Sequence, residues 1–119
     1  RVSDIKYISA HGTATIHNDI AETKAIKKVF GDYAYTIPIS SQKSMIGHTI
    51  GAAAAIECGI TALILKNSII TPTINLDYFD PQCDLDYVPH RPRKAENLRT
   101  AISNSFGFGG HNSTIVLHK

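Results

Sequence analysis

The chain has 119 residues, a formal net charge of +2 at pH 7, 43% hydrophobic residues and 18% charged residues. This length suits one compact domain, and the composition is typical of a folded protein rather than a disordered one. The small net charge, without a basic stripe interleaved with aromatic residues, argues against nucleic-acid binding.

The two cysteines, Cys58 and Cys83, show neither CxxC nor Cys/His spacing typical of zinc sites. We therefore expect free thiols in a reducing compartment and no metal. The chain begins at Arg1, without a methionine or a segment resembling a signal peptide, so we interpret it as a fragment.

The first elements are a strand and a helix. Residues 2–9 are rich in β-forming residues and predict a strand, followed by a small-residue loop at 10–15. A helix follows to about Phe30, with Asn18 or Asp19 as its cap and Asp19 and Glu22 at capping-box spacing. Its apolar face should cover a sheet, and Gly31 suits the position beyond its end.

The chain is organised around residues 39–57. Residues 33–40 predict a second strand, and a polar loop then leads to Gly47 and His48, which open a long stretch rich in alanine and isoleucine. The apolar residues of 49–66 lie nearly all round the helix, so we expect it to be buried on most sides. Glu57 at its centre favours a core helix over a membrane span.

The remaining chain predicts an extended connection and a hairpin. Residues 68–86 are rich in turn formers, 86–89 predict a short strand, and 90–99 predict a solvated loop. Residues 100–105 and 113–118 are β-like and flank a glycine-rich tip. The order of elements predicts a mixed α/β half-unit without an internal repeat.

Two histidines are the candidate catalytic groups. His11 and His48 each follow a predicted strand near a predicted helix start, where free N–H groups discourage protonation and favour a neutral hydrogen-bond donor. Lys43, five residues before His48, adds a positive charge near the start of the same predicted helix. From spacing alone, a paired catalytic role and a structural role are about equally supported. A metal site is a weaker rival, because no HExxH motif or third ligand completes it.

Other residues have both ordinary and functional interpretations. The tip at 107–110 is either a tight turn or a place where backbone N–H groups approach an anionic oxygen, with Phe108 as a gate. It lacks the GxGxxG and P-loop patterns. We expect Glu57 to be a structural carboxylate bonded to loop N–H groups or paired with Lys43. The cysteines do not lie at helix N-termini, and we interpret four further histidines as structural or surface residues: His17, His90, His111 and His118.

Five motifs in chain order resemble the C-terminal half of the β-ketoacyl-[acyl-carrier-protein] synthase II family: HGTAT (11–15), NDIAE (18–22), KSMIGH (43–48), PTINL (72–76) and NSFGFGG (104–110). The likeness covers essentially the whole chain. It implies a thiolase-like fold, in which two α/β halves pack as a five-layer αβαβα sandwich. Residues 1–119 would form the C-terminal ketoacyl-synthase domain, with a mixed sheet ending in a β-hairpin and without the N-terminal half.

The resemblance also implies an activity, namely fatty-acid elongation by decarboxylative Claisen condensation of an enzyme-bound acyl group with malonyl-[acyl-carrier protein]. No cofactor is implied, because the phosphopantetheine arm of acyl carrier protein holds the substrates. The implied enzyme is a cytoplasmic homodimer, or is plastidial or mitochondrial in a eukaryote. Neither nucleic acid nor membrane is an implied partner.

The resemblance assigns roles position by position. His11 and His48 match the histidines that bond the malonyl thioester oxygen, and Lys43 matches the lysine that organises them. Phe108 matches the gate whose N–H completes the oxyanion hole. The remaining matches are pantetheine-binding Thr13 and Thr15, the neighbouring loop residues Phe106, Gly107 and Gly109, and the structural network of Glu57, Asp19 and Glu22.

The chain also departs from the family. The nucleophilic cysteine belongs to the missing half, so we expect this chain alone not to form an acyl-enzyme. Ile16 and His17 replace residues that are often small or proline, which leaves the path of the arm open. A polyketide ketosynthase domain, synthase I and a non-catalytic partner resembling a chain-length factor remain alternatives. A thiolase is disfavoured because its second half carries a cysteine near the loop where this chain has Phe108.

Overall fold

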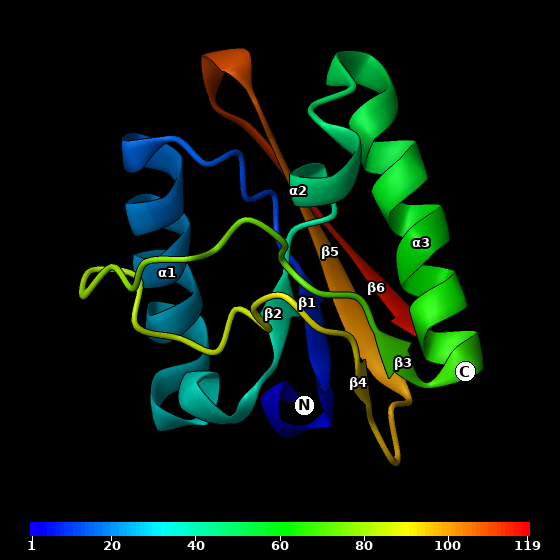
Figure 1. The fold of residues 1–119 in the computed structure, drawn as a ribbon. Coiled ribbons are helices and arrows are strands. Elements are labelled where there is room, and N and C mark those ends of the chain that lie inside the picture. The colour runs from blue at the N-terminus through cyan, green and yellow to red at the C-terminus, as the bar shows by residue number, and fades with distance from the viewer.

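The computed structural model describes residues 1–119 as three layers, with a mixed sheet between two helices (Figure 1). The sheet has the strand order β2-β1-β5-β6, in which β1 pairs in parallel with β2 and β5, and β6 is antiparallel to β5. Helix α1 (Ile16–Phe30) covers one face and α3 (Ala53–Asn67) covers the other. The predicted mixed α/β fold with a terminal hairpin is confirmed.

Strand β1 (Tyr7–Ser9) lies between the two hydrophobic clusters because its side chains alternate between faces. Ile8 packs with Ile26 of α1, whereas Tyr7 packs with Ile64 of α3. The strand is shorter than predicted because Val2–Asp4 forms a 3₁₀ turn, η1. Burial on both faces fixes the register of β1, and with it the position of the loop that follows.

Helix α1 begins differently from the prediction. Thr15 is the N-cap, and its side chain accepts a hydrogen bond from the N–H of Asn18. The expected cap at Asn18 or Asp19 is therefore wrong. The capping box is also absent, because Glu22 is buried and turned toward the loop after β1. The helix ends as predicted at Gly31, whose φ is 57°.

The segment after α1 contains less strand than predicted. Residues Gly31–Thr36 form a 3₁₀ helix, η2, in which the Thr36 hydroxyl donates to the carbonyl of Tyr33. Strand β2 is only Ile39–Ser40, because it pairs with the last two residues of short β1. The apolar face predicted for α1, Ala21, Ala25, Ile26, Val29 and Phe30, is only partly covered, because Ala21, Ala25 and Val29 are exposed.

Three helical pieces follow β2: α2 (Lys43–Ile46) lies within the predicted polar loop, and the long apolar segment forms η3 (Ile50–Ala52) and α3. By length and mean hydropathy, 1.4, Ile50–Asn67 would suffice to cross a membrane, and 28% of it is buried. The expectation of burial on most sides is wrong for this chain, because Ile56 and Leu63 are exposed on the outer face. The inner face of α3 packs on β5 and β6 and carries Glu57.

The C-terminal part follows the prediction more closely. Strands β5 (Thr100–Gly107) and β6 (His111–His118) form the hairpin, joined by η4 (Phe108–Gly110). The predicted strand at 86–89 is wrong, because only an isolated bridge joins Thr73 to Pro89. The predicted loop at 90–99 contains β4 (Arg93–Lys94), which pairs with β3 (Ile69–Ile70).

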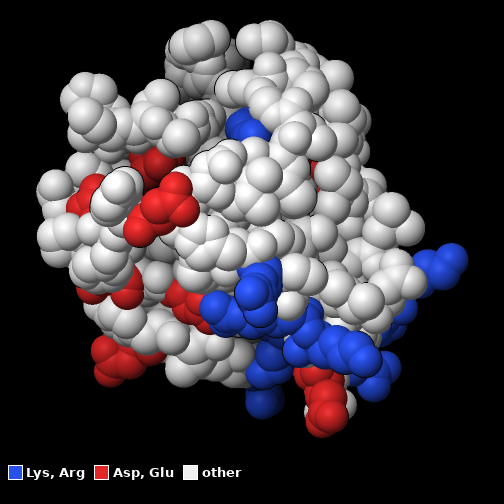
Figure 2. All heavy atoms as spheres, viewed as in Figure 1, with Lys and Arg blue, Asp and Glu red and all other residues white.

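Charged side chains are unevenly distributed on the viewed face (Figure 2). Basic residues gather near β3 and β4, and acidic residues gather on the side of α1. The segment predicted to be solvated includes β4 and has four exposed basic residues: Arg91, Arg93, Lys94 and Arg99. Arg93 is paired there with Asp86.

Candidate active site

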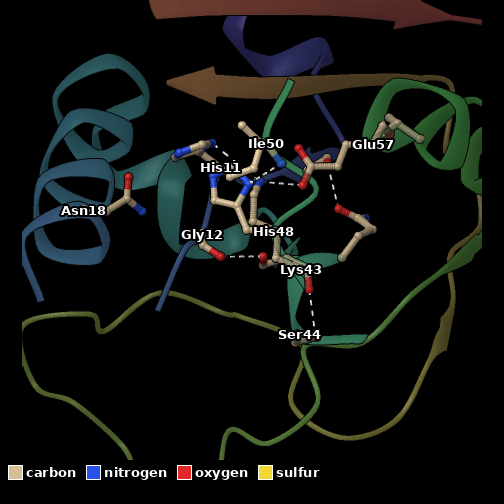
Figure 3. A network of polar contacts seen from close by, with 12 residues as sticks. His11, Gly12, Asn18, Lys43, Ser44, His48, Ile50 and Glu57 are labelled. Carbon is tan, nitrogen blue, oxygen red and sulfur yellow. Dashed lines mark hydrogen bonds and ion pairs between the residues drawn. The ribbon is translucent and has the colours of Figure 1, made fainter. Parts of the chain in front are cut away.

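The fold brings His11 and His48 together. His11 lies two residues beyond β1, and His48 lies in the loop between α2 and η3 (Figure 3). Their ring centroids are 5.6 Å apart with an interplanar angle of 85°, and the Phe106 ring is 5.3 Å from His11. Two imidazoles and one aromatic ring therefore form a compact cluster.

His48 lies just ahead of a helix start, as expected, because η3 begins at Ile50 and continues directly into α3. The backbone N–H of Ile50 donates to Nδ1 of His48 over 3.0 Å. Because Nδ1 is an acceptor, a neutral His48 carries its proton on Nε2. A free N–H at the start of a helical segment thus sets the tautomer that the predicted donor role requires.

Lys43 fixes the tautomer of His11. The Nζ of Lys43 lies 3.5 Å from Nδ1 of His11, and an ammonium group can only donate. His11 is 7% exposed. Burial, followed by the charge of Lys43 and the neighbouring His48, lowers the pKa of His11 to about 4. His11 is therefore neutral at pH 7, with Nε2–H as its donor.

Lys43 is itself held by Glu57. The two side chains form an ion pair, and they are 5% and 1% exposed. Glu57 projects from the inner face of α3, so the pair ties that helix to α2. The structure confirms the predicted pairing of Glu57 with Lys43. A buried ion pair of this kind holds both groups in place, because removing one partner leaves an uncompensated charge.

Glu22 anchors the backbone of the His11 loop. Its carboxylate accepts hydrogen bonds from the backbone N–H groups of His11 and Gly12, each over 3.0 Å, and from the Asn104 amide over 3.2 Å. Gly12 has a φ of 40°, and a Cβ there would lie 2.6 Å from the Cβ of Ser41. Glu22 belongs to the network as expected, whereas the side chain of Asp19 is bonded only to neighbouring Asn18.

A cavity of about 450 Å³ opens beside the histidines. The predicted loop residues Phe106 and Gly107 line it together with His11 and His48. His111, which we interpreted as a structural or surface residue, is exposed but also lines this cavity. A larger groove of about 960 Å³ runs between α1 and residues 73–90. Neither His11 nor His48 lines this groove, so the smaller cavity is the candidate site.

The other predicted site residues lie outside the lining of this cavity. Thr13 and Thr15 share a hydroxyl hydrogen bond of 3.0 Å, and Thr15 also caps α1. Phe108 is 98% exposed at the hairpin tip. Gly109 beside it has a φ of 79°. The expected roles of these four residues in binding and gating stay predictions.

Neither cysteine belongs to the site. Cys58 lies on α3 and Cys83 lies in the loop before β4, and both are free and partly buried. Burial raises the pKa of the Cys83 thiol, which opposes formation of the thiolate. Neither residue lines the histidine cavity.

The N-terminal part of the chain matches a known protein family. Residues 1–77 match the family described as beta-ketoacyl synthase, C-terminal domain. The chain belongs to this family.

Curated relatives in the family are similar over nearly the whole chain. The 3-oxoacyl-[acyl-carrier-protein] synthase 2 of Synechocystis sp. is 50% identical over 97% of this chain. The oxytetracycline polyketide putative beta-ketoacyl synthase 1 of Streptomyces rimosus is 51% identical over 97%. In each case the chain spans 27% of the length of the relative.

Solved structures of ketosynthases share the fold. A type II polyketide synthase acyl carrier protein in complex with its ketosynthase has a TM-score of 0.94 at 46% identity, over 98% of this chain and 28% of that one. A beta-ketoacyl synthase from Burkholderia phymatum has a TM-score of 0.92 at 39% identity, over 99% and 28%. These likenesses confirm the predicted ketoacyl-synthase fold.

Proposed function

We propose that this chain supplies the two-histidine site of a β-ketoacyl-[acyl-carrier-protein] synthase. The enzyme condenses an enzyme-bound acyl group with malonyl-[acyl-carrier protein], with loss of CO₂, and gives 3-oxoacyl-[acyl-carrier protein]. The observation that carries the proposal is the pair of adjacent imidazoles whose Nδ1 atoms are both occupied, by Lys43 and by the N–H of Ile50.

This arrangement suits the chemistry of decarboxylation. When the malonyl C–C bond breaks, its electron pair becomes an enolate, and negative charge develops on the thioester oxygen. Two neutral Nε2–H donors stabilise that oxygen without a proton having to leave a cationic ring. Removing one such donor typically costs on the order of a hundredfold in rate.

The acyl-transfer half of the reaction requires a cysteine outside this chain, because Cys58 and Cys83 lie away from the histidine cavity. Thr13 and Thr15 would contact the phosphopantetheine arm. Phe108 would gate the site, with its N–H in the oxyanion hole. Acyl carrier protein is then the partner that delivers both substrates, and no further cofactor is needed. We propose a cytoplasmic homodimer for the complete enzyme.

A polyketide ketosynthase is the second candidate, because the relative from Streptomyces rimosus is as similar as the fatty-acid enzymes. Products distinguish the two. A fatty-acid enzyme releases a 3-oxoacyl chain after one condensation, whereas a polyketide enzyme retains and extends the unreduced chain. A chain-length factor is a third possibility, since the ishigamide ketosynthase/chain length factor has a TM-score of 0.95 at 39% identity. Retention of both histidines and Lys43 favours an enzyme.

The test uses the protein expressed at the full length that its gene encodes. We expect His11→Ala and His48→Ala each to reduce malonyl decarboxylation and condensation about a hundredfold. Acylation of the nucleophilic cysteine should persist in both variants. His118→Ala is the control, since His118 bonds Thr100 at the opposite end of β5. Unchanged turnover in both variants would refute the proposed site.

A separate test concerns the isolated chain. Incubated with a radiolabelled acyl thioester, it should remain unlabelled. A stable acyl group linked to Cys58 or Cys83 would contradict the proposal that the nucleophilic cysteine lies outside this chain.

A further inference from the structure

A second buried polar cluster lies at β1 and the end of β2, and its centre is Gln42, which is 0% exposed. The Oε1 of Gln42 accepts a hydrogen bond from the Ser9 hydroxyl over 2.8 Å. Its Nε2 donates to the Tyr7 hydroxyl over 2.7 Å and to the Thr71 hydroxyl over 3.3 Å. Both amide protons and the amide oxygen are thus used, and a buried amide satisfied in this way resists displacement.

The cluster closes on itself. Because Tyr7 accepts from the Gln42 amide, its own proton is free to bond the Ser40 hydroxyl, 2.8 Å away. The Ser40 hydroxyl in turn lies 3.5 Å from that of Thr71. Burial raises the pKa of Tyr7, so the phenol stays neutral and acts as both donor and acceptor. Hydrogen bonds in such a closed, buried group support one another.

The hydrogen bonds of Gln42 join two segments that lie next to residues of the candidate site. Ser9 is the last residue of β1 and lies two residues before His11. Gln42 immediately precedes Lys43, the first residue of α2. The amide therefore joins the backbone that carries His11 to the backbone that carries Lys43.

Helix α2 needs such an anchor because it has only four residues, Lys43–Ile46. One helical turn has little stability of its own. Gln42 occupies the N-cap position but makes no side-chain capping bond, since its amide points to the sheet instead. A second tie comes from Ser41, whose hydroxyl donates to the Gly12 carbonyl over 2.7 Å. Losing Gln42 would thus loosen α2 rather than release it.

We propose that Gln42 is a positioning residue, whose buried amide ties β1 to α2 and so sets the separation between Lys43 and His11. The proposal rests on the function proposed above. It assigns Gln42 no contact with substrate, so its effect reaches the reaction through the position of α2, first of all through Lys43. The alternative is a glutamine that merely stabilises the core.

Gln42→Met and Tyr7→Phe in the full-length protein distinguish these roles. Methionine keeps the length of the glutamine side chain and removes every hydrogen bond of the amide. Phenylalanine keeps the tyrosine ring and removes the hydroxyl that bonds Gln42 and Ser40, so this variant serves if the first fails to fold. Thr100→Val is the control, because it removes a buried hydroxyl bonded to His118 at the far end of β5.

We expect kcat for malonyl decarboxylation to fall about tenfold in Gln42→Met, and by less in Tyr7→Phe, with KM within twofold of the wild type, because small displacements of catalytic groups reduce rate strongly. The second readout is the titration midpoint of His11, measured by NMR on protein with isotope-labelled histidines. His11 faces Lys43, His48 and the ring of Phe106, with Glu57 behind Lys43. If Lys43 moves away from His11, the titration midpoint of His11 should rise in the folded protein, whereas a purely structural loss leaves it unchanged.

The proposal is overturned if kcat stays within twofold of the wild type in both variants. It is equally overturned if kcat falls while the His11 midpoint remains that of the wild type and of Thr100→Val. A wild-type protein that does not decarboxylate malonyl groups would refute the proposed function instead. The His11 titration would still decide the role of Gln42 in that case.

Discussion

Replacing Lys43 by methionine separates the structural and catalytic effects of the buried ion pair. The substitution leaves the Glu57 carboxylate, which is 1% exposed, without its cation. Breaking a buried pair in this way typically costs about 3–5 kcal/mol of stability. The same substitution removes the donor 3.5 Å from Nδ1 of His11, so nothing selects the Nε2–H tautomer. We expect activity to fall on the order of a hundredfold, about 2.7 kcal/mol in the barrier.

The double variant Lys43→Met/Glu57→Gln gives the decisive comparison. It removes the orphaned charge, so most of the lost stability should return, because neutral replacement of both partners of a buried pair is often tolerated. Activity should remain low, since His11 still lacks its donor. Chemical denaturation and malonyl decarboxylation of the full-length protein measure the two quantities.

The control for this experiment is Lys27→Met, which breaks the partly exposed pair with Asp84. It should cost little stability, because exposed ion pairs contribute little, and it should leave activity unchanged. Recovery of activity together with stability in the double variant would refute the reasoning, because it would show that Lys43 acts only by neutralising Glu57.

Three further outcomes follow from the structure. His11 has a pKa of about 4 in the folded protein but titrates near 6.5 when unfolded. The free energy of unfolding should therefore fall by about 2–3 kcal/mol as pH drops from 6.5 to 4. His11→Gln should flatten this part of the denaturation profile, and an unchanged slope would contradict the role of His11. Glu22→Ala should destabilise the protein by several kcal/mol and reduce decarboxylation, because it orphans one buried and one partly buried N–H group and the Asn104 amide. Wild-type melting and turnover would exclude this anchoring role. Gly12→Ala should reduce decarboxylation at least about tenfold, because its Cβ would overlap Ser41 and shift the neighbouring His11; a crystal structure of the variant with His11 unmoved would argue against this.

The sequence predicts elements whose signals are local. The hairpin of β5 and β6 follows from two β-like runs around a glycine-rich tip, and the end of α1 follows from Gly31. The strand predicted over 33–40 is mostly absent. Despite its β-rich composition, this segment contains part of a 3₁₀ helix, in which the Thr36 hydroxyl donates a hydrogen bond to the Tyr33 carbonyl. Local hydrogen bonding there outweighs intrinsic strand preference.

The partners of buried polar groups are harder to predict because they are distant in sequence. The spacing of Glu22 from Asp19 favours a capping box, yet Glu22 instead bonds the loop at 11–12 and Asn104. His111 likewise reaches the histidine cavity only because the hairpin returns alongside β5. The apolar composition of α3 predicts a buried helix, but no local pattern shows that this chain covers only one of its faces.

Both imidazoles depend on a single short segment. Lys43 begins it and donates to His11, and Ile50 lies just beyond His48 and donates to that ring, so residues 43–50 set both tautomers. The position of His11, in contrast, comes from β1 and Glu22. A rigid-body shift of the segment would therefore disturb the donors of both rings while leaving the sheet intact. For this reason we expect the proposed chemistry to be sensitive to the anchors of α2 on β1.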